Sequence, residues 1–290
     1  MTPKVSVLLP SYNHEQYVEA AVRSVMTQTG VDFELIVIDD GSSDSSPQIL
    51  AKLQAEYGFT FIHRSNKGVV ATLTEALSMA NGRYICSFSS DDVMPPERLK
   101  KQSDYLDAHS DAVVCFGQVV PLLDDGSLGE MDVRYLRSVP EVSFEESFLG
   151  KKALHGCAEM FVREKILAIG GYDLRYYFED YPLYLKILYT YGPQPVLDDV
   201  VCCYYREHGD NMHVNHDRIY REILRMLAEN YSSQPLYDEA VRSWKANWFS
   251  AVAAQSKMDA LRLIPKVISS SPKFWLRLPK LVIPKNRLKF

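Results

Sequence analysis

Two pairs of adjacent aspartates each follow a short apolar run of the kind that forms a buried strand. Asp39 and Asp40 come directly after a run that begins at residue 35, and Asp91 and Asp92 follow a second run that begins at residue 84. Neighbouring carboxylates repel each other unless a cation or hydrogen-bond donors compensate their charge. Mg²⁺ and Mn²⁺ prefer hard oxygen ligands and commonly share them with phosphates. Asp91 and Asp92 are therefore candidate ligands for a divalent ion.

The first pair opens the segment Asp39-Asp-Gly-Ser-Ser-Asp44. Asp, Gly and Ser favour turns, so a turn capped by its own side chains is one interpretation. Recognition of a nucleoside is the other, because carboxylates accept hydrogen bonds from a nucleobase imide and from ribose hydroxyls. The second pair has a similar alternative, which is to cap a helix that we expect to open at Pro95 and Pro96.

The elements around these residues alternate between strand and helix. Apolar and helical periodicity predicts strands near residues 5–9, 33–38, 59–63, 84–88 and 112–120, with helices near 15–29, 46–57, 69–80 and 95–109. Asn13 is the N-cap that we predict for the first helix. This rhythm predicts an α/β fold with a mainly parallel sheet flanked by helices on both faces. In such sheets ligands bind beyond the carboxyl ends of the strands. Three of those ends carry polar clusters, at residues 10–13, 39–43 and 89–92.

The second half of the chain has a looser pattern. Residues 122–142 are polar and predict a loop, followed by a helix at 179–191, a strand at 195–205, and helices at 217–231 and 236–254. The pair Glu179-Asp180 stands where the first of these helices begins, a position that acidic residues commonly occupy as caps.

Four segments, taken together, resemble the family 2 inverting glycosyltransferases. They are Val5-Ser-Val-Leu-Leu-Pro-Ser-Tyr-Asn13, Glu34-Leu-Ile-Val-Ile-Asp-Asp-Gly-Ser-Ser-Asp44, Asn66-Lys-Gly68, and Gly82-Arg-Tyr-Ile followed by Ser90-Asp-Asp92. The resemblance implies the GT-A (Rossmann-like) fold over residues 1–210. Residues 1–120 would form its nucleotide-binding half and residues 121–210 its acceptor half. A helical extension would follow at 211–290.

The resemblance also implies roles for individual residues. It assigns the nucleotide, a uridine nucleotide in the usual case, to Pro10, Tyr12, Asn13, Asp39, Asp40, Asn66, Gly68, Ser90 and Asp91. It assigns a Mn²⁺ or Mg²⁺ ion to Asp91, Asp92 and His208, and the role of catalytic base to Asp180. A base is required because inversion needs the acceptor hydroxyl to lose its proton as it attacks. Ser89 stands where the family often has a further acidic residue, which would weaken metal binding.

The activity implied is inverting transfer of a sugar from a nucleotide-sugar donor, with a UDP-sugar expected, to a hydroxyl of a glycan or lipid-linked oligosaccharide. We expect a hexosyl- or N-acetylhexosaminyltransferase of bacterial cell-surface polysaccharide biosynthesis. A non-catalytic homologue that binds a nucleotide or a glycan is one alternative. A sugar-phosphate nucleotidyltransferase is another, although the first loop, residues 11–14, lacks the Gly, Lys and Arg of a phosphate-binding loop. No Gly-x-Gly-x-x-Gly follows the first strand, which disfavours a dinucleotide dehydrogenase.

Charge is unevenly distributed along the chain. Residues 260–290 carry eight Lys or Arg and no Asp or Glu, although the whole chain has a formal charge of −5. Cations mixed with apolar residues suit an anionic membrane surface, so we predict peripheral membrane contact through residues 272–290. Packing of this tail on the acidic remainder of the chain, and contact with nucleic acid, are the alternatives. We expect that the protein does not bind nucleic acid.

The five cysteines are scattered, odd in number and mostly set in apolar runs. They predict buried, reduced thiols rather than a disulfide framework. We see neither a leader sequence nor an apolar run long enough to span a bilayer. These features predict a cytoplasmic protein, with the basic tail on the inner face of the membrane.

Overall fold

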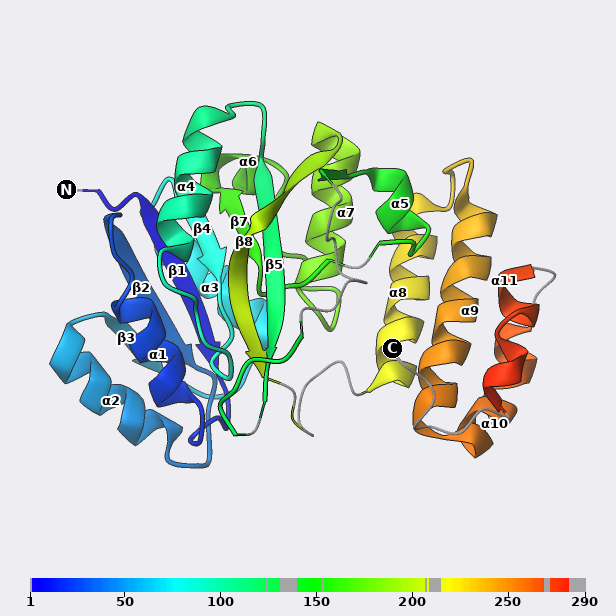
Figure 1. Cartoon of the computed structure of the whole chain (residues 1–290), viewed down its shortest axis with the longest axis horizontal. Coiled ribbons are helices and arrows are strands. Elements are labelled where there is room, and N and C mark those ends of the chain that lie inside the picture. The colour runs from blue at the N-terminus through cyan, green and yellow to red at the C-terminus, as the bar shows by residue number, and fades with distance from the viewer. Residues whose placement is uncertain are drawn as a thin grey trace. The chain divides into compact units, whose positions relative to one another are not determined.

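The structure is a computed structural model. It describes residues 2–123, 125–130, 140–152, 154–206, 208, 215–268 and 272–281. The chain divides into two compact units (Figure 1). The first unit contains residues 1–144 and 152–207, and the second contains residues 145–151 and 208–290. The sequence placed the corresponding boundary at residue 210.

The first unit is built on one mixed sheet, in which the strand order is β3-β2-β1-β4-β7-β5-β8-β6. Strands β1, β2, β3 and β4 run parallel to one another, and β7 lies antiparallel between β4 and β5. The strands are β1 (Val5–Ser11), β2 (Phe33–Asp39), β3 (Thr60–His63), β4 (Tyr84–Ser87), β5 (Val114–Leu122), β6 (Glu141–Val142), β7 (Glu159–Val162) and β8 (Gln194–Arg206). The predicted mainly parallel α/β fold is confirmed.

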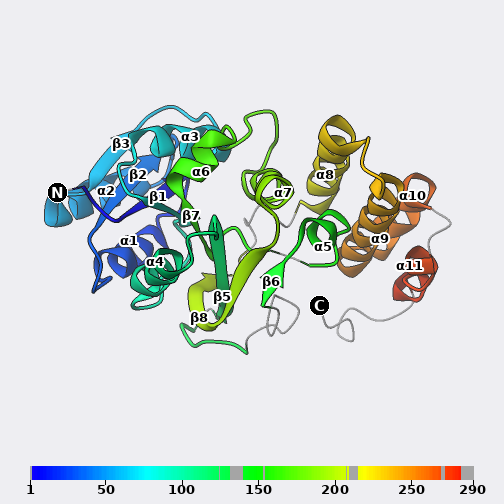
Figure 2. The same cartoon turned by 90° about the horizontal axis from the view of Figure 1, so that it is seen from above.

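Helices cover both faces of this sheet (Figures 1 and 2). Along β1, Val7 and Leu9 pack with α1, α2 and α4, whereas Leu8 packs on the opposite face with α3, α6 and α7. This alternation follows from the two-residue repeat of a strand. The helices are α1 (Val18–Met26), α2 (Ser46–Tyr57), α3 (Val69–Met79), α4 (Arg98–Ala108), α6 (Arg163–Ala168) and α7 (Asp180–Tyr191).

Two local predictions differ from the structure. The cap predicted at Asn13 is wrong, because α1 begins at Val18 and Asn13 adopts a left-handed backbone with φ of 54°. The sequence also did not predict β7, which has only four residues and begins with the charged Glu159. Glu159 is nevertheless buried.

The second unit is helical. It contains most of α5 (Phe144–Phe148), together with α8 (His216–Tyr231), α9 (Tyr237–Gln255), α10 (Lys257–Val267), α11 (Pro272–Trp275) and the 3₁₀ turn η2 (Leu278–Leu281). Its core joins Phe249 of α9 to Leu263 and Val267 of α10 and to Phe274 of α11. The indole of Trp244 donates a hydrogen bond to the carbonyl of Phe148 at 2.9 Å, which ties α9 to α5. Within the described residues, no helix combines the length and apolarity that a membrane span requires.

All five cysteines are buried and reduced, as predicted. They belong to the first unit, where the charge of the buried Arg98 acts on each of them. Burial raises the pKa of the Cys86 thiol to about 11 and that of Cys202 to about 12. Since the thiolate is the nucleophilic form, these residues are inert packing groups.

Candidate functional site

The first two polar clusters meet because β1 and β2 are parallel and in register, with Ser11 beside Asp39. The loops that follow these strands are joined by hydrogen bonds. The amide of Asn13 donates to Ser42 Oγ at 2.8 Å, and the Asn13 side-chain oxygen accepts from the amide of Ser43 at 2.8 Å. The left-handed backbone of Asn13 therefore holds two strand ends together instead of capping a helix.

Asp39 is fully buried, and both of its carboxylate oxygens have partners within the protein. Ser42 donates to them through its amide at 3.0 Å and its hydroxyl at 2.6 Å. Nδ1 of His63, the last residue of β3, lies 2.8 Å from the same carboxylate. The negative charge of Asp39 thus fixes the turn after β2 to the neighbouring strand.

Asp40 connects this turn to the loop before α3. Its two carboxylate oxygens accept hydrogen bonds from the amides of Lys67 and Gly68, each at 2.8 Å, and Arg64 forms an ion pair with one of them. Each carboxylate oxygen can accept about two hydrogen bonds, so acceptor capacity remains for a ligand. The predicted residues Asp40, Asn66 and Gly68 therefore belong to one loop assembly.

Two glycines permit this assembly. Gly41 has φ of +80°, and a Cβ there would lie 2.7 Å from the amide nitrogen of Asn66. Gly68 has φ of 88° and ψ of 157°, a conformation open essentially to glycine alone. A Cβ at Gly68 would meet no atom within 4 Å, so its outer side faces open space. Of the other predicted nucleotide contacts, Pro10 is half-buried in β1 and Tyr12 is 49% exposed.

The third polar cluster follows β4, which pairs with β1 on the side opposite β2. His14 connects it to the first loop, because Nδ1 of His14 lies 2.7 Å from Ser90 Oγ. The other ring nitrogen, Nε2, lies 4.0 Å from Oδ2 of Asp91. The predicted residues Ser90 and Asp91 therefore both lie next to the imidazole ring of His14. His14 was not among the residues predicted from the sequence, although it directly follows the polar cluster at residues 10–13.

Asp92 is the residue after Asp91, but its carboxylate lies in a different environment. Its Oδ1 accepts a hydrogen bond from the amide of Arg206 at 2.9 Å, while the side chain of Arg206 donates to the carbonyl of Asp91 at 3.1 Å. Oδ2 of Asp92 is buried with no N–H or O–H partner among the described residues. Burial, reinforced by the charge of Asp91, raises the pKa of Asp92 to about 8. The carboxyl group of Asp92 is therefore a buried group held by the end of β8.

Asp180 is the first residue of α7, where the partial positive charge of the helix N-terminus favours a carboxylate. The amide of Tyr181 donates to Asp180 Oδ1 at 2.6 Å. Burial raises the pKa of Asp180, and burial together with the Asp180 charge raises the pKa of Glu179 to about 8. A carboxylate with a raised pKa is a stronger base, which suits proton abstraction near neutral pH.

The segment before α7 is tied to the end of β4. The hydroxyl of Tyr172 lies 3.0 Å from Ser87 Oγ, and Ser87 is the last residue of β4. Glu159 of β7 is also buried, and burial raises its pKa to about 7. The contact between Tyr172 and Ser87 connects the strand before Asp91 and Asp92 with the segment that leads into α7.

The backbone of Gly156 lies close to the side chain of Asp180. A Cβ at Gly156 would lie 3.0 Å from Asp180 Oδ2 and 3.2 Å from Asp180 Cβ. If Asp180 is the base that the sequence resemblance implies, we expect Gly156→Ala to displace its carboxylate by a few tenths of an ångström and to lower the kcat of the implied sugar transfer roughly tenfold, because reaction rates depend steeply on the position of the reacting groups. Steady-state release of the nucleotide product, followed with kcat and KM separated, measures this effect.

The matched control for that variant is Gly58→Ala. Gly58 ends α2 with φ of 76°, and a Cβ there would meet nothing within 4 Å. Its substitution strains only the backbone, so it should lower Tm without changing kcat. Equal kcat values for Gly156→Ala and the wild type would show that Gly156 does not position Asp180.

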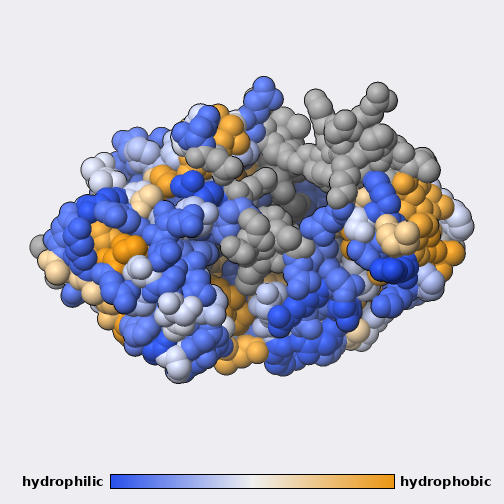
Figure 3. Space-filling view, turned by 90° about the horizontal axis from the view of Figure 1, so that it is seen from below, coloured by the Kyte–Doolittle hydropathy of each residue, from blue (hydrophilic) through white to orange (hydrophobic). Residues whose placement is uncertain are grey.

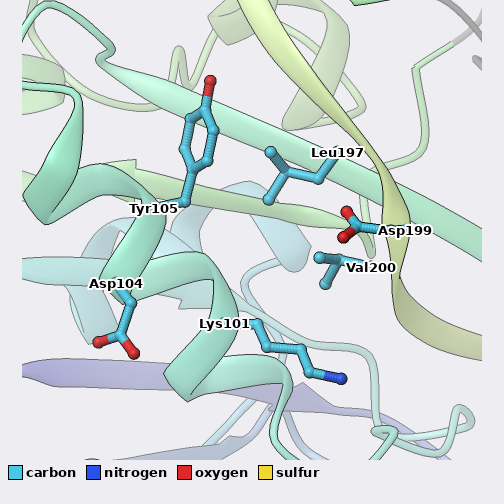
Figure 4. A pocket seen from close by; sticks show the side chains of 6 residues that line it. All are labelled: Lys101, Asp104, Tyr105, Leu197, Asp199 and Val200. Carbon is cyan, nitrogen blue, oxygen red and sulfur yellow. The ribbon is translucent and has the colours of Figure 1, made fainter.

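A surface hollow of about 350 Å³ lies elsewhere in the first unit. Figure 4 shows its lining side chains, which come from α4 and β8: Lys101, Asp104, Tyr105, Leu197, Asp199 and Val200. None of them is a predicted site residue, so this hollow is separate from the cluster at the strand ends. The remaining predicted residue, His208, belongs to the second unit, and its metal role stays a prediction.

The sequence model of glycosyl transferase family 2 matches residues 6–167, which is more than half of the chain. The chain belongs to glycosyl transferase family 2. The match covers every strand-end cluster described above and stops before Asp180.

Curated relatives of this family 2 protein include named bacterial glycosyltransferases. The chain is 36% identical over 143 residues to the putative glycosyltransferase EpsE of Bacillus subtilis, covering 48% of this chain and 50% of EpsE. It is 28% identical over 163 residues to the putative teichuronic acid biosynthesis glycosyltransferase TuaG of the same organism, covering 55% of this chain and 62% of TuaG. An uncharacterized protein of Mycobacterium bovis, Mb1547, is 35% identical over 128 residues, 42% of this chain and 37% of that protein. The chain therefore spans less than two thirds of these relatives.

Solved structures share the fold over nearly the whole family 2 chain. S. aureus TarS, residues 1–349, matches with a TM-score of 0.66 at 20% identity, over 96% of this chain and 80% of TarS. The same fragment has been solved with UDP-GlcNAc and with UDP. The mannosyltransferase PcManGT of Pyrobaculum calidifontis, in complex with GDP-Man and Mn²⁺, matches with a TM-score of 0.63 at 18% identity, over 100% of this chain and 89% of PcManGT. These matches confirm the predicted GT-A fold.

Proposed function

We propose that this protein transfers a sugar from a nucleotide-sugar donor, a UDP-sugar, to a hydroxyl group with inversion at the anomeric carbon. The acceptor is a glycan or a lipid-linked oligosaccharide of a cell-surface polysaccharide, and the sugar is a hexose or an N-acetylhexosamine. One observation carries the proposal. The polar loops after β1, β2, β3 and β4 are joined through Asn13, Asp40 and His14 at the carboxyl end of the sheet, where α/β proteins bind nucleotides.

The donor nucleoside is assigned to the loops after β1 and β2. Asp39 fixes the turn, and Asp40 keeps acceptor capacity for an N–H or O–H group of the nucleoside. Gly68 leaves open space where the backbone of the next loop would approach the nucleotide. Solved structures of TarS with UDP support this choice of nucleotide.

We assign the divalent ion, Mn²⁺ or Mg²⁺, to Asp91. Its carboxylate is a hard oxygen donor beside a ring nitrogen of His14, a ligand set that Mn²⁺ accepts. Asp92 is less suited to direct ligation because Arg206 already binds Oδ1 and Oδ2 is buried. When bound, a divalent cation stabilises the negative charge that develops on the leaving diphosphate. The guanidinium of Arg206, bound to the carbonyl of Asp91, adds positive charge at the same place.

We assign the catalytic base to Asp180. Its Oδ2 would take the proton of the acceptor hydroxyl as that oxygen bonds to the anomeric carbon and the sugar–phosphate bond breaks. The helix N-terminus holds the carboxylate, and Gly156 limits its movement. No covalent intermediate is needed.

Transfer is tested by incubating the protein with UDP-glucose, UDP-GlcNAc and GDP-mannose in the presence of Mn²⁺. Acceptor-stimulated release of UDP, with an inverted anomeric configuration in the product by NMR, is the expected result. Binding of the nucleotide with no release under any acceptor would favour the non-catalytic homologue that Ser89 suggests. Release of pyrophosphate from UTP and a sugar 1-phosphate would instead favour a nucleotidyltransferase.

We further propose that the protein works at the inner face of the cytoplasmic membrane, where a lipid-linked acceptor would be presented. The segment from which we predicted membrane contact, 272–290, is described only as far as residue 281, and residues 282–290 lie outside the described part of the chain. The described residues of the second unit give this proposal a more definite surface.

A further inference from the structure

Exposed apolar side chains are concentrated in one short stretch of the second unit. Of the eleven large hydrophobic side chains that are exposed in the described part of the chain, five lie between residues 258 and 276. Figure 3 shows hydrophobic residues gathered on the surface of the helical unit. Scattered single apolar residues are normal on a protein surface, whereas a cluster of them indicates an interaction site.

Three of these five side chains lie in α10 or at its C-cap, because α10 carries two apolar stripes. One stripe, Ala260, Leu263 and Val267, is buried in the core of the second unit. The other consists of Met258, Leu261, Pro265 and Ile268, at spacings of three and four residues that place them along one side of a helix. Met258 is 58% exposed, Leu261 49% and Ile268 51%. The second stripe points away from the core.

Cations border the exposed stripe. Arg262 and Lys266 each follow an apolar residue of the stripe by one position and are themselves exposed. Arg262 pairs with Asp259 at 3.1 Å, and Asp259 is the last acidic residue of the chain. Beyond it, residues 260–290 carry only positive charge. Trp275, the last residue of α11, and Leu276, which follows it, are 51% and 80% exposed.

We propose that the outward face of α10 docks on an anionic lipid surface. The aliphatic stripe would enter the boundary between headgroups and acyl chains, while Arg262 and Lys266 remain at the level of the lipid phosphates. The positive charge of residues 260–290 complements anionic headgroups. The link to a lipid-linked acceptor rests on the proposed function, but the surface itself rests only on α10.

Co-flotation of the full-length protein with vesicles tests this surface. Wild-type protein should bind vesicles of phosphatidylcholine with 30% phosphatidylglycerol, a composition of roughly physiological surface charge. It should bind pure phosphatidylcholine much more weakly, and high salt should reduce binding to the anionic vesicles. We expect M258Q/L261Q to lower partitioning roughly tenfold. R262Q/K266Q should lower it about fivefold for each cation removed.

The matched control is L167Q/L174Q, which removes two leucines that are 44% and 63% exposed in the first unit. This variant should bind vesicles as the wild type does, and all variants should keep the wild-type Tm because the substituted side chains are exposed. Unchanged binding of both α10 variants would overturn the proposal. If the wild type is a dimer in solution and M258Q/L261Q is a monomer with vesicle binding intact, the surface belongs to a second copy of the chain instead.

Separate measurements test the lipid surface and the proposed function, so either one can be contradicted without the other. If the wild type binds anionic vesicles through α10 but transfers no sugar, the lipid surface stands and the proposed function falls. If the α10 variants release UDP at the wild-type rate with a water-soluble acceptor and also bind vesicles normally, the function stands and the lipid surface falls.

Discussion

Asp180→Asn should lower the kcat of sugar transfer by about 10²–10⁴-fold, the usual contribution of a general base, and leave the Kd for the nucleotide-sugar unchanged. The amide keeps the shape of the side chain, and its oxygen can still accept the hydrogen bond from the amide of Tyr181. It cannot take a proton from the acceptor. Steady-state transfer and isothermal titration with the donor separate the two effects.

The pH profile sharpens this prediction. Burial raises the pKa of Asp180 in the folded protein, and only the deprotonated carboxylate can act as a base. Transfer by the wild type should therefore fall as the pH drops through that raised pKa, and this acidic limb should be missing from the residual activity of Asp180→Asn. Asp173→Asn is the control, since Asp173 pairs with Arg175 at 2.6 Å and has no assigned role in transfer. Asp180→Asn turnover near that of the wild type would remove Asp180 from the mechanism.

Asp91→Asn should abolish the metal dependence of donor binding and lower kcat/KM by about 10²-fold or more, because metal stabilisation of a leaving group is worth several kcal/mol. The amide oxygen is a weaker, uncharged ligand. The contact between this position and Nε2 of His14 does not replace the lost charge. Thermal shifts with UDP, in the presence and absence of Mn²⁺, measure the effect directly.

Asp92→Asn is the matched control, one residue away. The Asn oxygen can still accept from the amide of Arg206, so we expect the Mn²⁺ response to persist. Its effect should appear in stability. The pKa of Asp92 rises from 3.8 to about 8 on folding, so the folded wild type binds more protons and loses stability relative to Asp92→Asn as the pH rises across that interval. If Asp92→Asn loses the Mn²⁺ response and Asp91→Asn keeps it, the assignment is reversed.

The fold of the first half of the chain was predictable because its first four strands are parallel and mostly buried. Runs such as Leu35–Ile38 are apolar at every position, as expected for strands covered on both faces, and their ends expose the polar clusters. Strand β7 was not predicted because it has only four residues and begins with Glu159, and a charged residue in so short a segment is more typical of a loop.

The different surroundings of the Asp91 and Asp92 carboxylates were not predictable. Adjacent acids are equivalent in a sequence pattern, and they differ here because the amide of Arg206, more than a hundred residues later, donates to the carboxylate of Asp92. Asn13 is a similar case. Its residue type fits a helix cap. Instead, its side-chain oxygen accepts a hydrogen bond from the amide of Ser43, in the loop after β2. Long-range pairing of loops overrides local preference at both positions.

The sequence showed that the basic tail mixes cations with apolar residues, but not which of those apolar residues lie on the surface. A proline commonly ends a helix, whereas α10 continues through Pro265 to Val267. Only the packing of Leu263 and Val267 into the second unit shows that Met258 and Leu261 point outward.

A thermal-shift panel of UDP-, GDP- and dTDP-sugars, with and without Mn²⁺, tests the central claim most directly. A ligand that binds only the folded state raises Tm with its concentration. We predict a rise with a UDP-sugar that requires Mn²⁺ and disappears in Asp91→Asn. No rise with any nucleotide-sugar in the presence of Mn²⁺ would contradict a donor site at the ends of β1, β2 and β4.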